Sequence, residues 1–283
     1  MKTFPDEAPI GVFDSGVGGL SVLRSIRQEL PAEHLSYIAD SANAPYGDRH
    51  AAFIEDRASI ITEFLLMAGV KAIVVACNTV TVVAIEKLRA WCPVPIVAME
   101  PAIRPASSCT RSKVVGVLAT SQTLASCNVA RLCALHGNDV RILLQACPGL
   151  VEQVERTDLT SETTRSLLMR YLSPLLEAGA DTIVLGCTHY LFLRQLIGEI
   201  AGPDVSIVDS AAAVARELAR RLGPNRKTSH GHIGQEQFFS SAPPEKARIS
   251  ISALWGRPVI VHGLMPGSPA SFSWQTPAGV QIS

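Results

Sequence analysis

The sequence lacks paired cysteines. Its seven cysteines are an odd number, and no two of them form a C-x-x-C pair in the 283 residues. A disulfide framework normally has an even number of cysteines, and a structural zinc site needs closely spaced pairs. The pattern therefore argues against both, and against a thiol redox protein. It favours a reducing compartment in which free thiols survive.

The sequence also lacks an excess of charge and long apolar runs. Lys+Arg and Asp+Glu each number 25, so the formal net charge is zero and no nucleic-acid partner is expected. The apolar stretches at 70–77 and 182–187 are too short to cross a bilayer. The N-terminal segment MKTFPDEAPI has no basic run before an apolar core, so it is not a signal peptide. We expect a cytoplasmic protein with no membrane partner.

Short apolar runs alternate with longer helical patterns. The runs are rich in Val and Ile and do not alternate with polar residues, which is typical of strands buried on both faces of a parallel sheet. The periodic stretches Arg49–Ala68 and Ser161–Ala178 predict helices that end at Gly69 and Gly179. This order predicts an α/β fold, and the length suits two small cores. The candidate strands are Ile10–Phe13, Leu35–Ala39, Ala72–Cys77, Pro95–Ala98, Val114–Leu118, Val140–Leu144, Thr182–Gly186 and Val205–Val208.

The C-terminal part differs in character. We expect a loop at Pro224–His232 and a helix with a short strand within Gln235–Arg257. The segment 264–283 is rich in Ser, Pro and Gly, which predicts a disordered tail.

The two halves of the chain resemble each other. The segment IVVACNT (73–79) contains Cys77, and the similar segment IVLGCTH (183–189) contains Cys187. Two βα units that share Val and Ile by composition alone are the simpler explanation. The alternative is an internal duplication with one reactive cysteine in each half. Since ligands bind beyond the carboxyl ends of parallel strands, the two cysteines would then approach one cleft from opposite sides.

Cys77 and Cys187 differ from the other cysteines by position. Each ends a buried strand and precedes hydroxyl or amide residues. A free thiol has a pKa of about 8.5. A helix N-terminus directly after each cysteine would favour the anion that a base needs. The remaining five are interpreted as small packing residues, namely Cys92, Cys109, Cys127, Cys133 and Cys147.

Other polar residues fall near the expected cleft. In an extended chain, His189 points to the same side as Cys187, although a structural histidine is the alternative. One Cys and one His are too few for a zinc site. The turn that starts with Asp14 and Ser15, DSGVGG, lacks the third glycine of a dinucleotide fingerprint because position 21 is Ser21. Its glycines instead favour close approach of the backbone to a small anion.

Two further segments have simpler alternatives. The sequence PYGD (45–48) reads as a turn, with Asp48 as the cap of the following helix. Glu152 taken alone would be a solvated carboxylate on a helix face.

Several pieces together resemble the glutamate racemase family, within the aspartate/glutamate racemase superfamily. They occur in the order of that family and span about residues 10–215. The DSGVGG and PYG elements favour glutamate over aspartate racemases. The matching pieces are IGVFDSGVGGLSV (10–22), YIADSANAPYGDR (37–49), VVACNT (74–79), VGVLATSQT (115–123), CPGLVE (147–152), VLGCTHYLFL (184–193) and residues 208–215.

The resemblance implies a role for each matched residue. Cys77 and Cys187 would be the pair of proton donor and acceptor, Asp14 would tune Cys77, and Glu152 and His189 would assist Cys187. The residues expected to bind substrate are Asp14, Ser15, Pro45, Tyr46, Gly47, Cys77, Asn78, Thr79, Thr120, Cys187, Thr188 and His189. Pro45, Tyr46 and Gly47 would bind the side-chain carboxylate through backbone groups.

The resemblance also implies an architecture and a reaction. It implies two similar three-layer α/β domains, related by a pseudo-twofold axis, with mostly parallel sheets and the active site between them. We expect one domain from 1–99 and 209–263, a second from 100–208, and a homodimer. The reaction would be cofactor-independent racemisation of glutamate for peptidoglycan synthesis, with no metal. Pyridoxal phosphate would require a Schiff-base lysine, and no lysine lies beside the matched motifs.

Alternatives and departures remain at this point. Sibling activities on aspartate, hydantoins or arylmalonates share the fold, and a non-catalytic amino-acid-binding module is a second class. The family usually has Pro where Leu191 stands, and small residues where Val80 and Val82 stand. Both departures are expected to reshape the cleft.

Overall fold

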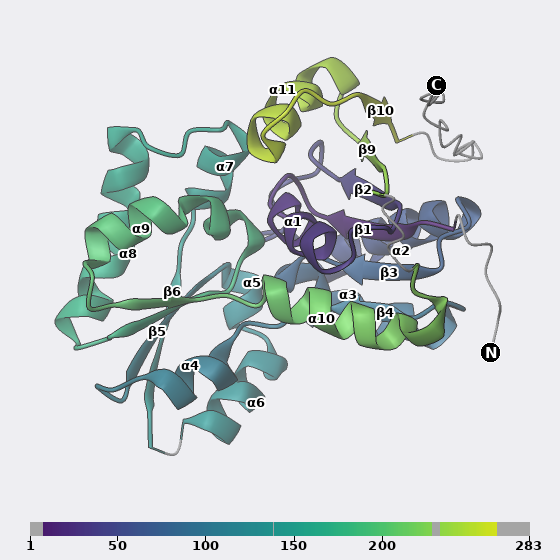
Figure 1. Ribbon diagram of the computed structural model, residues 1–283. Helices are drawn as coiled ribbons and strands as arrows, with labels where there is room; N and C mark the ends of the chain where they lie inside the picture. Colours follow the sequence, from purple (N-terminus) through teal and green to yellow (C-terminus); the bar gives the residue numbers. More distant parts are fainter. Residues whose placement is uncertain (1–7, 138, 228–232, 265–283) are drawn as a thin grey trace, which may run out of the picture.

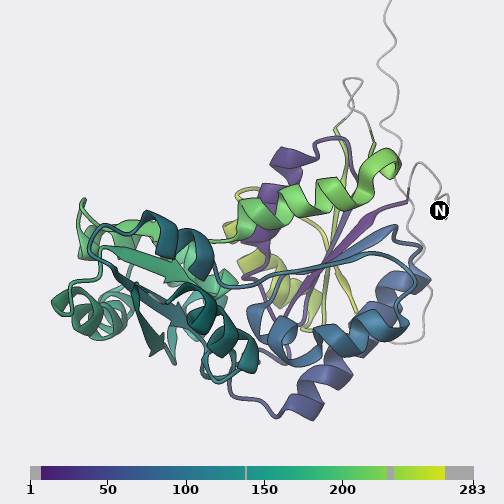
Figure 2. The ribbon, with the colours of Figure 1, turned by 90° about the horizontal axis from the view of Figure 1, so that it is seen from below.

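The computed structural model of the protein describes residues 8–137, 139–227 and 233–264. Two parallel sheets lie side by side as the centres of two lobes (Figures 1 and 2). The first sheet has the order β10-β9-β2-β1-β3-β4. Its strands are β1 (Ile10–Asp14), β2 (Leu35–Ala39), β3 (Ala72–Val75), β4 (Ile96–Ala98), β9 (Glu236–Ser240) and β10 (Val261–Gly263).

The second sheet repeats the central part of the first. Its order is β6-β5-β7-β8, which corresponds to β2-β1-β3-β4. Its strands are β5 (Val114–Ala119), β6 (Arg141–Ala146), β7 (Thr182–Leu185) and β8 (Ser206–Val208). Every strand pair that the structure describes is parallel, which confirms the predicted α/β class. The shared order supports the interpretation that the chain contains an internal duplication.

Helices cover both faces of the first sheet, as Figure 2 shows with α10 on one side and α3 on the other. Consecutive side chains of β1 pack into two different core clusters, one on each face of the sheet: Val12 belongs to one and Phe13 to the other. This explains why the strands lack polar alternation. The helices are α1 (Leu20–Glu29), α2 (Ala51–Met67), α3 (Asn78–Trp91), α4 (Ile103–Cys109), α5 (Ser121–Leu124), α6 (Cys127–His136), α7 (Leu150–Glu155), α8 (Glu162–Glu177), α9 (Arg194–Ala201), α10 (Ala211–Leu222) and α11 (Pro244–Trp255), with 3₁₀ turns η1 (Thr188–Leu193) and η2 (Gly223–Asn225).

Most local expectations are confirmed. Gly69 and Gly179 follow α2 and α8 with φ of +73° and +87°, values that glycine adopts without strain. Asp48 as a helix cap is wrong: α2 begins at Ala51 after His50, and no side chain caps it. In the described part of the chain, no helix is both long and apolar enough to cross a membrane.

The C-terminal part joins the first lobe. The predicted strand and helix are β9 and α11, and β9 pairs with β2. The short edge strand β10 was not predicted. The expected loop overlaps η2, and its residues 228–232 lie outside the described residues. The expected tail also lies outside them, apart from Leu264.

Asp181 ties the start of β7 to the loop before β5. Its carboxylate accepts hydrogen bonds from the Thr110 hydroxyl at 2.6 Å and from the backbone N–H groups of Arg111 and Ser112 at 2.7 and 2.8 Å. Burial alone would raise the pKa of Asp181, but these bonds and one from Thr182 lower it well below its usual range. The bonds therefore stabilise the ionised carboxylate of the folded state.

Replacing this carboxylate is expected to destabilise the protein. Asp181→Asn should lower the free energy of unfolding by about 2 kcal/mol at pH 7, because hydrogen bonds to charged groups are lost. A lowered pKa contributes stability above the unfolded-state value of about 4, and this contribution disappears as the pH falls through the folded-state value. Urea unfolding at pH 7 and pH 3 measures the difference, which should shrink at the lower pH. An equal difference at both values would contradict the assignment.

Candidate active site

The predicted site residues meet where the two sheets face each other. Asp14 is the last residue of β1, Thr120 follows β5 directly, and Cys77 and Cys187 each lie two residues beyond equivalent strands, β3 and β7. Asp14, Cys77 and Cys187 are buried. The sequence pattern placed all four at strand ends, and the structure brings these ends together through the contacts described next.

Cys77 begins helix α3. It stands directly before Asn78, so the free N–H groups of the first turn lie beside its sulfur. Its Sγ lies 3.6 Å from the hydroxyl oxygen of Ser15. Burial, and then the charge of Asp14, raises the pKa of Cys77 well above its usual value. The Cys77 side chain is therefore a thiol at neutral pH, suited to give a proton.

Asp14 links the two lobes. The glycine-rich turn wraps around its carboxylate, which accepts hydrogen bonds from the N–H groups of Ser15 at 2.8 Å and Gly19 at 2.6 Å. A Cβ at Gly19 would lie 2.8 Å from the Asp14 Cβ, so only glycine allows this approach. From the second lobe, the hydroxyl of Thr188 donates to Asp14 at 3.1 Å. Burial raises the pKa of Asp14, although His189 and Cys77 partly oppose this.

In the second lobe, His189 connects the sulfur of Cys187 to the carboxylate of Glu155. Nδ1 of His189 lies 3.9 Å from Sγ of Cys187, and its Nε2 lies 2.7 Å from Oε1 of Glu155. Burial alone would lower the pKa of His189, but the contacts with Cys187 and Glu155 and the charge of Asp14 raise it well above its usual value. His189 is therefore a cation beside Cys187 at neutral pH.

The carboxylate that reaches His189 is Glu155, and sequence reasoning missed it. Both Glu152 and Glu155 lie on α7, but the contact and the hydrogen bond from the Val17 N–H at 2.8 Å belong to Glu155. Glu152 instead lines a small cavity of about 20 Å³ together with Pro45 and Gly47. Of the two carboxylates on α7, it is therefore Glu155 that contacts His189 on the Cys187 side, whereas the resemblance had implied Glu152. The only signal in the sequence was the spacing E-x-x-E, which does not say which carboxylate faces inward.

Hydroxyl and amide groups complete the space between the lobes. The Thr79 hydroxyl lies 3.0 Å from that of Thr120, which joins α3 to the second lobe, and Thr120 donates to Thr123 at 2.9 Å. The side-chain amide of Asn78 is buried, and neither its nitrogen nor its oxygen has a hydrogen-bond partner in the described part of the chain. A buried polar group without a partner is costly, so this amide is suited to a polar ligand.

The segment PYG (45–47) lies opposite Thr120. A Cβ at Gly47 would approach the Thr120 Cβ to 3.0 Å, so the glycine allows close contact of the lobes. The hydroxyl of Tyr46 donates to Asp40 instead of facing the other lobe. The Tyr46 hydroxyl is therefore occupied within the first lobe.

The family comparison agrees with this geometry. The family model for Asp/Glu/hydantoin racemases matches residues 10–218. The chain belongs to the Asp/Glu/hydantoin racemase family. This confirms the resemblance noted in the sequence.

Individual relatives are more specific. A glutamate racemase of Methylococcus capsulatus is 53% identical over 95% of this chain and 98% of its own. The structure of a glutamate racemase isoform from Bacillus anthracis has a TM-score of 0.83 at 30% identity, covering 92% of this chain and 98% of that one. The Escherichia coli glutamate racemase, solved with L-glutamate and an activator, UDP-MurNAc-Ala, has a TM-score of 0.79 at 32% identity and covers 91% and 98%. The two-lobed racemase architecture is therefore shown.

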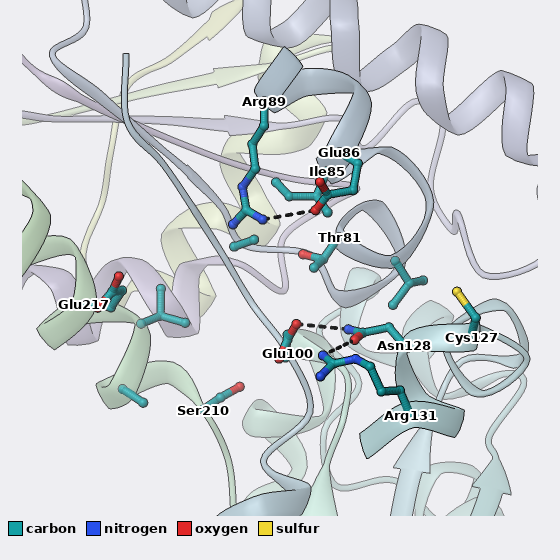
Figure 3. Close-up of a pocket in the computed structure, with 14 residues that line it drawn as sticks. Thr81, Ile85, Glu86, Arg89, Glu100, Cys127, Asn128, Arg131, Ser210 and Glu217 are labelled. Atoms are coloured by element: carbon teal, nitrogen blue, oxygen red, sulfur yellow. Dashed lines mark hydrogen bonds and ion pairs between the residues drawn. The ribbon is translucent and has the colours of Figure 1, made fainter. Parts of the chain in front are cut away.

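A second, larger cavity lies at the connection between the lobes of this racemase-family chain. It has a volume of about 750 Å³ and is lined by the connecting residues Glu100 and Ser210 (Figure 3). Asn128 donates to Glu100 at 3.0 Å, and Arg131 donates to Asn128 at 2.8 Å. Neither Cys77 nor Cys187 lines this space, so its size does not make it the active site.

The side chains that depart from the family pattern pack against the core or line the cavity at the connection. Val80 is fully buried in the core beneath α3, and Val82 lines the cavity at the connection. Leu191, in η1, is partly buried against the core. The structure thus gives each an ordinary packing contact.

The other cysteines are only partly as expected. All seven cysteines are free thiols. Cys147 is buried and Cys92 and Cys133 are partly buried, whereas Cys109 and Cys127 are exposed, so their interpretation as buried packing residues is wrong. Among the described residues, no three His, Cys, Asp or Glu side chains form a group that would hold a metal ion.

Proposed function

We propose that the protein interconverts L- and D-glutamate by two-base proton transfer between Cys77 and Cys187. The observation that carries this proposal is the equivalent position of the two buried thiols, each two residues beyond a matching strand, β3 or β7. Asp14 accepts a hydrogen bond from Thr188, next to Cys187, and affects the pKa of Cys77 by its charge. The two sulfurs therefore belong to one polar network, to which both lobes contribute side chains.

The network gives the two thiols different starting states. Cys187, whose Sγ lies 3.9 Å from Nδ1 of His189, is assigned to take the Cα proton of one enantiomer. Burial and Asp14 keep Cys77 protonated, so it returns a proton to the opposite face of the carbon. After turnover the sulfurs have exchanged states, which allows the reverse reaction. The N–H groups that open α3 and η1 support the charge that develops between them.

Glutamate is the substrate that the surroundings of the thiols and the relatives favour. The unpaired amide of Asn78 and the hydroxyls of Ser15, Thr79 and Thr188 would hold the α-carboxylate. Backbone groups of residues 45–47, opposite Thr120, would hold the side-chain carboxylate. The E. coli relative was solved with L-glutamate, and the curated relatives carry the name glutamate racemase.

The wider setting is part of the same proposal. D-glutamate made here would supply peptidoglycan synthesis in the cytoplasm, and the enzyme would act as a homodimer. The domain boundaries 1–99 with 209–263, and 100–208, are proposed on the same basis. Light scattering on the purified protein tests the dimer, for which twice the mass of 30.2 kDa is expected.

Isotope incorporation tests the reaction itself. Purified protein with L-glutamate, no added cofactor and D₂O buffer should give loss of the circular dichroism signal of glutamate, together with deuterium at Cα. Parallel assays with aspartate and a hydantoin distinguish the sibling activities. Deuterium-free, optically unchanged glutamate would leave only a binding module.

A further inference from the structure

Asp40 carries a buried carboxylate that the proposed chemistry does not use. It follows β2 directly and is 0% exposed. Arg57 of α2 donates to its two oxygens at 2.9 and 2.8 Å, and Asn43 donates at 2.9 Å. The hydroxyl of Tyr46 donates to it as well. Since donors from the chain itself occupy both oxygens, this carboxylate is not a substrate ligand.

Two of these donors, Asn43 and Tyr46, belong to the loop that carries the segment 45–47, and Arg57 holds the same carboxylate from α2. The ring of Tyr46 is 1% exposed and packs edge-on against Phe53 at 6.2 Å. Burial, and then the charge of Asp40, raises the pKa of Tyr46 far above its usual range, so its hydroxyl remains a donor. The side chain of Tyr46 thus extends into the first lobe, while the next residue, Gly47, faces Thr120 of the second lobe.

We propose that Asp40 and Arg57 are positioning residues that fix the segment 45–47 at the cleft and thereby set the affinity for a substrate with a side-chain carboxylate. The inference rests on the proposed function, because it takes glutamate as the substrate. Arg57 is planar and binds Asp40 through two parallel hydrogen bonds, which fixes direction as well as distance. Backbone groups that bind a carboxylate must be held to within about 0.5 Å, and a buried bidentate pair provides that rigidity.

Substitutions of the pair should change substrate binding more than chemistry. In Arg57→Lys, the bidentate contact is lost while the charge remains. We expect KM for both glutamate enantiomers to rise about tenfold or more, with kcat within about threefold of wild type, since binding of a non-reacting group is what is weakened. Tyr46→Phe, which keeps the ring and removes only the hydroxyl, should move KM in the same direction. Because both donors share Asp40, the double variant should raise KM less than the product of the single effects.

A second arginine provides the matched control. Arg27 donates to Glu236 at 2.6 Å and to four backbone carbonyls in the same lobe, away from residues 45–47. Arg27→Lys should lower the thermal midpoint without changing KM or kcat. An unchanged KM in folded Arg57→Lys and Tyr46→Phe, or an equal rise in Arg27→Lys, would overturn the inference. Wild-type protein without racemase activity would instead reject the proposed function.

Discussion

Cys77→Ser and Cys187→Ser are each expected to lower the rate of glutamate racemisation by about 10²–10⁴-fold or more, because each removes one general acid–base group. A serine hydroxyl is far less acidic than a thiol, so it neither takes nor returns the Cα proton at neutral pH. Circular dichroism at the glutamate band measures the rate. Both side chains are nearly the size of serine, so the far-ultraviolet spectrum and the thermal midpoint should remain close to wild type.

The other cysteines serve as comparison for this experiment. Cys109 and Cys127 are exposed and lie outside the network around Asp14. Cys109→Ser is expected to racemise glutamate at the wild-type rate. If Cys77→Ser or Cys187→Ser kept that rate too, the thiol in question would have no role in proton transfer.

Glu155→Gln is expected to lower kcat/KM by about 10²-fold and to shift its alkaline limb to lower pH by about one unit. Glu155 is an acceptor for His189 and contributes to the raised pKa of that imidazole. Removing the charge lowers this pKa, so the cation beside Cys187 is lost at a lower pH. The pH profile of kcat/KM from pH 6 to 10 measures the shift.

Glu152→Gln is the paired variant on the same helix. It makes no contact with His189, so the alkaline limb should remain where it is in wild type. A shift in Glu152→Gln, with none in Glu155→Gln, would restore the assignment made from sequence and contradict the one made from structure.

The same histidine links activity to stability. A raised folded-state pKa stabilises the folded protein fully below the unfolded-state value of about 6.5, and the contribution is lost as the pH rises through the folded-state value. The unfolding free energy of wild type should therefore decline on the alkaline side more than that of Glu155→Gln.

The sequence predicted the framework because burial leaves a direct signal in it. Strands such as β3 and β7 are covered on both faces, so they consist of Val and Ile and end where the polar site begins. This was enough to place Asp14, Cys77, Thr120 and Cys187 at strand ends. It also indicated that the chain contains two related halves.

Features that depend on how a side chain is oriented, or on contacts between distant residues, left no such signal in the sequence. Glu152 and Glu155 are three positions apart on one short helix, and which of them meets His189 depends on how α7 packs against the rest of the fold. The three-residue strand β10 has only one buried residue and so shows no strand pattern. Asp40 lies in a segment that matches the family, but its four hydrogen bonds arise from residues up to 17 positions away.

The most direct test of two sulfurs on opposite faces of one carbon is Cα–H exchange in the single variants. Each variant keeps one thiol, so each should exchange the Cα proton of one glutamate enantiomer with D₂O much faster than that of the other, without inversion. Cys77→Ser and Cys187→Ser should prefer opposite enantiomers when exchange is followed by proton NMR. The same preference in both variants would place the two thiols on one face and contradict the account.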